Sequence, residues 1–321
     1  MNKLLPLLAL ALPLIVSGCT LPGGIDIPWL WGGTISMEND IVVIKSIQAI
    51  PSTVTAPQQV RLIVDIQNQG SHDFSGNAGE GTSEKIKVDL YDHCEGLFKK
   101  SDITRTCEGS SVSGETECEI DKILPKEIKQ IVWTLKPDEN TKLITPCTLK
   151  VSVTYPYKTT GLTSVNYIGS QEYANQLARG TFRAVSSTNS LGEGPVKAWF
   201  EIKDQQPIVC TTGTPSPIPV TLNIQNKGAG FVDKDDVKIT DTNIFVEPFN
   251  AKTDGCSFKK NYDEKKPEKL IQKSRTLPCN IMQLTDTDVP KETTRHIKVE
   301  TEYKYEFRDD VKVTVNPQPK T

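Results

Sequence analysis

Hydrophobic and polar residues alternate along one early segment in the way that a half-buried β-strand requires. Val60, Leu62, Val64 and Ile66 alternate with residues of which all but Ile63 are polar, through the segment that ends IVDIQNQG, residues 63–70. This period of two predicts a strand with one buried face. The closing Asn-x-Gly supplies the tight backbone that ends such a strand.

The same pattern returns in the second half of the chain as PVTLNIQNKG, residues 219–228. Val220, Leu222 and Ile224 take the buried positions there. Other features match in the same order: the segment around Cys94 resembles that around Cys256, and the segment around Cys118 resembles that around Cys279. We infer that one structural module is duplicated.

Two aromatic-rich segments, 149–157 and 297–307, alternate in the same way. After the second one, Asp309 and Asp310 are expected to form a turn, and 311–315 to return as the other strand of a hairpin. The tyrosines of these segments could form a binding face, but packing within the sheet is the favoured interpretation. They are Tyr155, Tyr157, Tyr303 and Tyr305.

Short alternating strands with Gly, Pro and Asn between them predict an all-β chain, with one β-sandwich in each half. One segment differs: residues 169–180 have Ser170 as a candidate N-cap, two apolar residues one turn apart, and Gly180 as a stop. A single short helix is therefore expected. The polar stretch after it places a domain boundary near residue 194.

The chain begins MNKLLPLLALALPLIVSGC, with a basic residue, a short apolar run and small residues before Cys19. This is the layout of an export signal, and the run is too short to span a membrane. The end VSGC resembles the lipobox of prokaryotic lipoproteins, which implies cleavage before Cys19 and its lipidation; an ordinary signal before a buried cysteine is the alternative. Trp29 and Trp31 either rest at lipid headgroups or pack on the first domain.

The predicted divisions are a signal peptide at 1–18, a lipidated tether at 19–38, sandwich domains at 39–193 and 194–316, and a tail at 317–321.

The 37 basic and 40 acidic side chains nearly cancel, and no basic stretch is suited to nucleic acid. Seven cysteines follow Cys19, and in an exported chain they are expected to be bonded, with one left over. No Cys-x-x-Cys pair or Cys/His cluster of zinc spacing occurs, so neither a metal nor a cofactor is expected.

The sequence has no recognisable catalytic motif. Ser257 begins a Ser-x-x-Lys, but the partner motifs of acyl-transferring enzymes are missing, which favours a surface loop. Carboxylates gather at 233–243 and 285–290, where calcium binding is one alternative and a solvated loop is the other.

The segment VVIKSIQAIPSTVTAPQQVRLIVDIQNQG, closed by Asn68 and Gly70, and the later IVWTLKP with Trp133 resemble CARDB-type domains, which are extracellular immunoglobulin-like modules associated with cell adhesion. The second half has Asn226 and Gly228 but no tryptophan at the matching strand. The resemblance implies two tandem immunoglobulin-like domains in a surface setting, more than a particular ligand.

The resemblance also implies one disulfide per copy, Cys94 to Cys118 and Cys256 to Cys279. Cys107 and Cys147 would then form a bridge of the first domain and leave Cys210 unpaired. Alternatively, Cys147 pairs with Cys210 as an interdomain clamp.

These observations predict a non-enzymatic protein that is exported and anchored by its lipid to the cell membrane, or to the outer membrane if the cell is diderm. It faces outward and binds a protein or glycan partner on the cell surface. The main alternative is a structural component of an envelope, pilus or secretion complex. An anchored hydrolase or solute-binding protein is a weaker alternative, and no nucleic-acid partner is expected.

Overall fold

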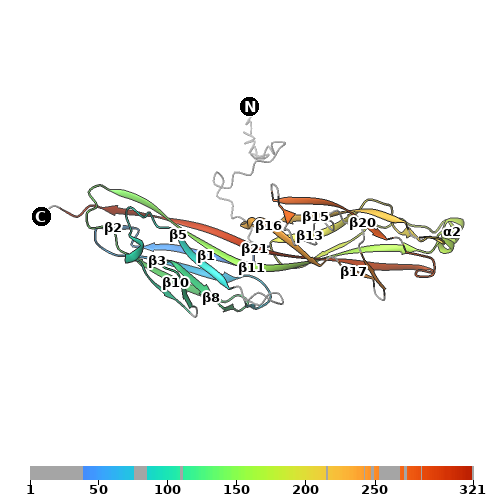
Figure 1. The fold of residues 1–321 in the computed structure, drawn as a ribbon, viewed down its shortest axis with the longest axis horizontal. Coiled ribbons are helices and arrows are strands. Elements are labelled where there is room, and N and C mark those ends of the chain that lie inside the picture. The colour runs from blue at the N-terminus through green and yellow to red at the C-terminus, as the bar shows by residue number, and fades with distance from the viewer. Residues whose placement is uncertain are drawn as a thin grey trace, which may run out of the picture. The chain divides into compact units, whose positions relative to one another are not determined.

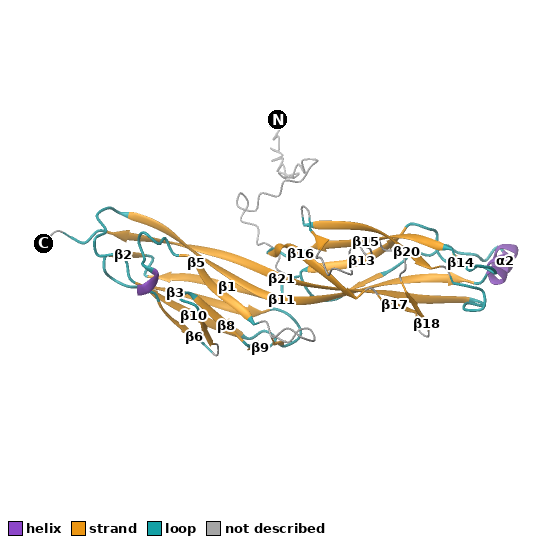
Figure 2. Ribbon diagram, viewed as in Figure 1, coloured by secondary structure: helices purple, strands orange, loops and turns teal. Residues whose placement is uncertain are grey.

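The structure is a computed structural model that describes residues 39–75, 85–108, 111–214, 216–241, 243–246, 249–252, 268–270, 273–282 and 284–319. The described residues lie in one compact unit, Ser36–Thr321. These residues are mostly β-structure, with 61% of them in strands and one short α-helix among them, so the predicted all-β class is confirmed (Figure 2).

In chain order the elements are β1 (Val42–Ile50), β2 (Thr53–Thr55), β3 (Val60–Asn68), β4 (Phe74–Ser75), β5 (Ile86–Asp92), the 3-10 helix η1 (Lys100–Asp102), β6 (Thr104–Cys107), β7 (Ser111–Ser113), β8 (Glu117–Ile120), β9 (Lys122–Ile123), β10 (Ile128–Leu135), β11 (Thr145–Ile168), α2 (Ser170–Arg179), β12 (Asn189–Leu191), β13 (Val196–Ile202), β14 (Ile208–Val209), β15 (Pro217–Asn226), β16 (Phe231–Asp241), β17 (Asn243–Val246), β18 (Phe249–Lys252), β19 (Glu268–Lys269), β20 (Ser274–Met282) and β21 (Glu292–Asn316).

Two long strands, β11 and β21, form the centre of the largest sheet (Figure 1). All 24 residues of β11 pair antiparallel with β21, from Thr145 opposite Val315 to Ile168 opposite Glu292. Strands β5, β8 and β7 extend this sheet beyond β11, and β16 and β19 extend it beyond β21. The two halves of the chain are therefore joined by one continuous ladder.

The hairpin predicted at Asp309 and Asp310 is wrong, because β21 runs straight through both residues. Asp309 pairs with Val151 and Asp310 with Lys150, in register with the rest of the ladder. A two-residue turn would have shifted the buried side chains from odd to even positions, whereas the odd positions stay on one face through to Val315.

Two smaller sheets share one arrangement. One has the strand order β1-β3-β10-β6 and the other β13-β15-β20, with the two Asn-x-Gly strands, β3 and β15, each between two neighbours. Both place apolar side chains at alternate buried positions, as predicted. Asn68 lies opposite Val42, and Asn226 lies opposite Val196, so the registers also agree.

The two asparagines make the same contacts. In both copies Nδ2 donates to the carbonyl oxygen four residues on, and Oδ1 accepts from the backbone N–H two residues on, at 2.9 to 3.0 Å. Each side chain is thus a buried brace for the loop after its strand. This shared geometry supports the inferred duplication.

The match drawn between Cys118 and Cys279 is wrong at the level of strands. Cys118 lies in β8, which pairs with β5 and β7, whereas Cys279 lies in β20, which pairs with β15. The strand that corresponds to β20 is β10, which pairs with β3 on the side away from β1. The two short segments resemble each other in sequence, but Cys118 and Cys279 do not occupy equivalent positions in the fold.

Strand β13 packs closely on the face of β11. A Cβ added at Gly161 would lie 1.8 Å from the carbonyl oxygen of Ala198, so this approach requires glycine. Beside it, the Phe200 N–H donates to Thr163 Oγ1 at 3.0 Å. The domain boundary near residue 194 stays a prediction, and the β11–β21 ladder runs through both of the halves that it would separate.

The short helix is present as α2 and ends at Gly180 in the left-handed conformation, as expected. Its N-cap residue is Gly169, not Ser170. The carboxylate of Asp286, more than a hundred residues later, accepts the Ser170 N–H at 2.6 Å and the Ser170 hydroxyl as well. The helix start is capped by a distant loop rather than by its own side chain.

Candidate functional site

Three connecting segments meet where β11 begins and β21 ends, and we call them the three-loop end: residues 51–59, which include the short strand β2, and the loops 93–99 and 136–144. The Asp138 N–H donates to the Leu97 carbonyl at 2.9 Å, which joins the second loop to the third. Loops held on a rigid sheet in this way are common positions for binding surfaces.

A disulfide clamps the three-loop end. Cys94, two residues after the end of β5, is bonded to Cys147 near the start of β11, with Cα atoms 6.1 Å apart. The Leu97 and Phe98 N–H groups both donate to the Cys94 carbonyl, which folds residues 94–98 into a compact turn. The clamp therefore ties the second loop to the strand that follows the third.

This pairing corrects the prediction. Cys118 is bonded to Cys107, and Cys94 to Cys147. The reason is strand register: Cys118 lies opposite Val88, which at ~3.3 Å per residue is about 20 Å along β5 from Cys94.

Cys210 is a buried free thiol, so the Cys147–Cys210 clamp is also wrong. Burial raises the pKa of the Cys210 thiol to about 11. Cys279 is disulfide-bonded as well. The lipidation candidate Cys19, the disulfide candidate Cys256, Ser257 and the two tether tryptophans also lie outside the described residues.

The third loop exposes two adjacent apolar side chains. Leu143 is 76% exposed and Ile144 is 67% exposed, more than any other large hydrophobic residue of the described part. Beside them, Leu143, Asn140 and residues 94–97 line an open depression of about 550 Å³. Sequence reasoning missed this pair, although an apolar dipeptide inside the polar stretch ENTKLITPC is a visible signal.

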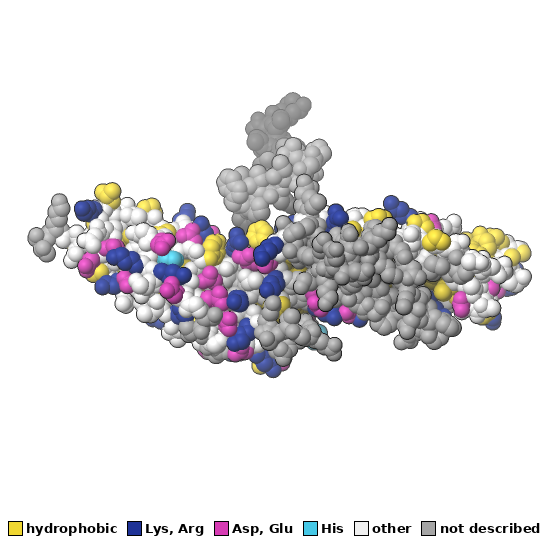
Figure 3. Space-filling view, in the orientation of Figure 1, with side chains coloured by type: hydrophobic (Ala, Val, Ile, Leu, Met, Phe, Trp, Pro, Cys, Tyr) yellow, Lys and Arg dark blue, Asp and Glu magenta, His cyan; other side chains and the backbone are white. Residues whose placement is uncertain are grey.

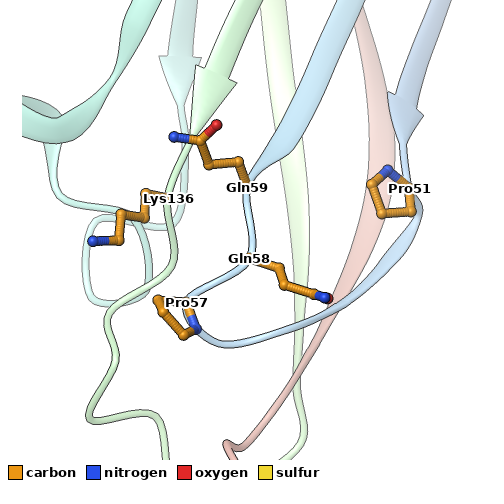
Figure 4. A pocket seen from close by; sticks show the side chains of 5 residues that line it. All are labelled: Pro51, Pro57, Gln58, Gln59 and Lys136. Atoms are coloured by element: carbon orange, nitrogen blue, oxygen red, sulfur yellow. The ribbon is translucent and has the colours of Figure 1, made fainter.

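A second depression at the same end, of about 610 Å³, is lined by Pro51, Pro57, Gln58, Gln59 and Lys136 (Figure 4). The Ile50–Pro51 and Ala56–Pro57 bonds are cis. Amide and ammonium groups offer hydrogen-bond donors next to apolar proline rings, a combination suited to an extended polar chain. This surface was also missed from sequence.

Electrostatic contacts fix the third loop at neutral pH. Two contacts lower the pKa of Asp138 to about 2: chiefly the hydrogen bond from the Asn140 backbone N–H, and next the contact with the Lys99 ammonium. The two contacts measure 2.9 and 3.0 Å. Asp138 therefore stays ionised and keeps its partners well below physiological pH.

A serine, a histidine and a carboxylate also meet elsewhere, at Ser71, His72 and Glu193. Ser71 Oγ contacts His72 Nδ1 at 2.7 Å, and Glu193 Oε2 contacts the same Nδ1 at 3.4 Å. A hydrolytic triad uses one ring nitrogen for the nucleophile and the other for the acid. Here Glu193 also accepts the Ser71 N–H, so the cluster is a brace between two loops.

The tyrosine row faces inward. Tyr155, Tyr303 and Tyr305 are buried and Tyr157 is partly buried, so packing within the sheet is confirmed. Neighbouring rings meet at centroid distances of 5.7 to 6.4 Å. The sequence-derived candidate for a binding face is therefore core.

Two acidic side chains of the second carboxylate segment already have partners. Asp286 caps α2, and Asp288 accepts the Thr285 N–H at 3.0 Å and its hydroxyl at 2.6 Å. Within the described ranges, no three His, Cys, Asp or Glu side chains gather as metal ligands would. The segment 233–243 is described only in part, and calcium binding there stays an alternative.

Basic and acidic side chains are interspersed over the visible face, and hydrophobic side chains gather near α2 (Figure 3). Among the described residues, no helix has the length and apolar character needed to cross a membrane. Comparisons of the sequence with protein-family models and with curated proteins give no match.

Proposed function

We propose that the chain is an exported, non-enzymatic binding protein, anchored to a membrane through lipid on Cys19, which contacts a partner on the cell surface with its three-loop end. The lipobox-like VSGC supports the anchor. The disulfides Cys94–Cys147 and Cys107–Cys118 favour a location outside the cytoplasm, where such bonds persist.

One observation carries the binding proposal: Leu143 and Ile144 are the most exposed large apolar side chains of the described part, on a loop held by a disulfide and by Asp138. Exposed apolar side chains on a pre-ordered loop lose little entropy on binding and gain free energy when a partner covers them. A protein partner with an apolar surface of its own fits this loop best.

A second candidate, a structural component of an envelope, pilus or secretion complex, is favoured by a different observation. The β11–β21 ladder continues for all 24 residues of β11 and joins both halves of the chain. Such a continuous ladder suits a spacer between two attachment points.

Crosslinking in intact cells followed by pull-down separates the two candidates. The binding proposal predicts external ligands or other cells among the captured partners, without a fixed complex. Recovery of one stoichiometric envelope complex would instead support the structural component. Membrane fractionation of Cys19→Ser tests the anchor: we expect an unprocessed chain or loss of membrane association, and normal processing with equal membrane binding would refute it.

A further inference from the structure

Of the exposed large hydrophobic side chains in the described part, two are aromatic: Tyr91 and Phe231. Both lie against the same arginine. The guanidinium carbon of Arg308 is 5.4 Å from the centre of the Tyr91 ring and 5.7 Å from that of Phe231. The three residues come from β5, β16 and β21 of the largest sheet. We call them the aromatic–arginine platform.

The strand register brings the three side chains together. Phe231 lies opposite Glu306, two residues before Arg308 on the same face of β21. On the other side, Leu90 pairs with Val151 and Asp92 with Lys150, so Tyr91 is the extra residue of a β-bulge. Bulges often redirect a side chain, and this one adds a ring to the outer face beside Arg308.

The arginine is held in place while its side chain stays open to solvent. Arg308 Nε donates to Glu306 Oε1 at 2.7 Å. The side chain of Arg308 remains 51% exposed, and Tyr91 and Phe231 are 43% and 51% exposed. A guanidinium fixed between two rings keeps its outer N–H groups available and loses little freedom when a ligand binds.

The chemistry of the platform suits a neutral sugar. A pyranose ring has an apolar C–H face that packs on an aromatic ring and hydroxyl groups that both donate and accept. Arg308 offers donors and Glu306 an acceptor side by side, and their charges cancel, so no net charge selects an anion. Lys150, which lies opposite Asp310, forms an ion pair with Asp92 at 2.8 Å, and Asp89 lies across β11 from Arg308. The surrounding charges therefore add no positive charge that would favour an anion.

We propose that the aromatic–arginine platform of Tyr91, Phe231 and Arg308 is a binding site for a neutral glycan. The site lies on the outer face of the largest sheet, with Tyr91 near the end of β5, just before the second loop of the three-loop end, and Phe231 and Arg308 on β16 and β21. It extends the function proposed above and does not depend on a protein partner at that end.

The test is titration of the full chain, extracted in detergent, with cellohexaose, maltohexaose, chitohexaose and, for comparison, an acidic hexagalacturonate. We expect a neutral hexasaccharide to bind. Phe231→Leu, which keeps an apolar side chain, and Arg308→Lys, which keeps the charge, should each weaken that binding at least about tenfold. Circular dichroism of each variant checks that the fold is retained.

The matched controls are Arg61→Lys, at an exposed arginine of β3, and Leu143→Ser at the three-loop end, and both should bind as the unchanged chain does. Absence of binding by every neutral hexasaccharide at about 10 mM would overturn the proposal. So would equal binding by the platform variants, or binding of the acidic sugar alone. Loss of cell-surface partners in Leu143→Ser with sugar binding intact would separate this site from the three-loop end.

Discussion

Trp133 and Cys279 occupy equivalent positions in the two halves of the chain. Trp133 lies opposite Leu62 of β3, and Cys279 lies opposite Val220 of β15, at the same point relative to the two Asn-x-Gly segments. Both side chains are buried. A disulfide-bonded cysteine therefore stands where the first half has its core indole, which accounts for the missing tryptophan in the second half.

The first prediction concerns Trp133, whose indole Nε1 donates to the Thr116 carbonyl at 2.8 Å. We expect Trp133→Ala to lower the free energy of unfolding by about 3–5 kcal/mol, because it leaves a cavity and an unpaired carbonyl. Denaturant titration measures this change. Leu124→Ala, at an exposed apolar residue of the same half, should change stability by less than about 1 kcal/mol. Similar losses in both variants would contradict the core role of the indole.

The second prediction tests the contact between β11 and β13. Gly161→Ala places a Cβ against the Ala198 carbonyl and should destabilise the chain by about 2 kcal/mol or more. Gly213→Ala is the control, because nothing lies within 4 Å of a Cβ added there. Thermal unfolding of both variants decides: equal melting temperatures would mean that β13 does not cross β11 this closely.

The third prediction is a pH dependence at Asp40. Burial raises the pKa of this carboxyl above its usual 3.8, although the Ala229 N–H, at 3.0 Å from Oδ2, partly opposes the shift. The folded chain thus holds the Asp40 proton more tightly than the unfolded chain. The contribution of Asp40 to the free energy of unfolding is therefore fully present below pH 3.8. It is lost as the pH rises through the raised pKa of the folded chain.

The Asp40→Asn variant has no carboxyl to ionise at this position and so does not lose stability in this way as the pH rises. The stability of the variant relative to the unchanged chain should therefore increase from pH 3 to pH 7. Chemical denaturation across this range measures the difference. Asp204→Asn, at an exposed acid, serves as the control. A constant difference between Asp40→Asn and the unchanged chain at all pH values would refute the buried acid.

The fourth prediction is the disulfide pattern. Digestion without reduction should give peptides that join Cys94 to Cys147 and Cys107 to Cys118. The 53-residue separation of the first pair corresponds to about 4 kcal/mol in the chain-entropy model, so Cys94→Ser with Cys147→Ser should lower stability by a value of that order. Peptides joining Cys94 to Cys118 would show that the strand register at β5 is different.

Alternation of apolar residues was enough to predict an all-β chain, the two Asn-x-Gly strands and the inward tyrosines. The helix followed from its spacing and from Gly180, but its cap, Asp286, is distant in sequence and leaves no local signal. The hairpin error arose because two aspartates resemble a turn. The phase of Phe307 and Val313, both at odd positions, already argued for one straight strand.

The disulfide pairs were beyond local reasoning, because they depend on which strands pair and in what register. Cys94 meets Cys147 only because β5 adds to the edge of β11. The aromatic–arginine platform was hidden for the same reason: Tyr91, Phe231 and Arg308 lie far apart in the chain and meet only across three strands.

The most direct test of the account is photo-crosslinking in intact cells from a benzophenone side chain placed at Leu143, compared with one at Leu191, an exposed residue of β12. We expect a discrete crosslinked partner from position 143 and none, or far less of the same product, from position 191. Equal products from both positions, or no product from position 143, would contradict binding at the three-loop end.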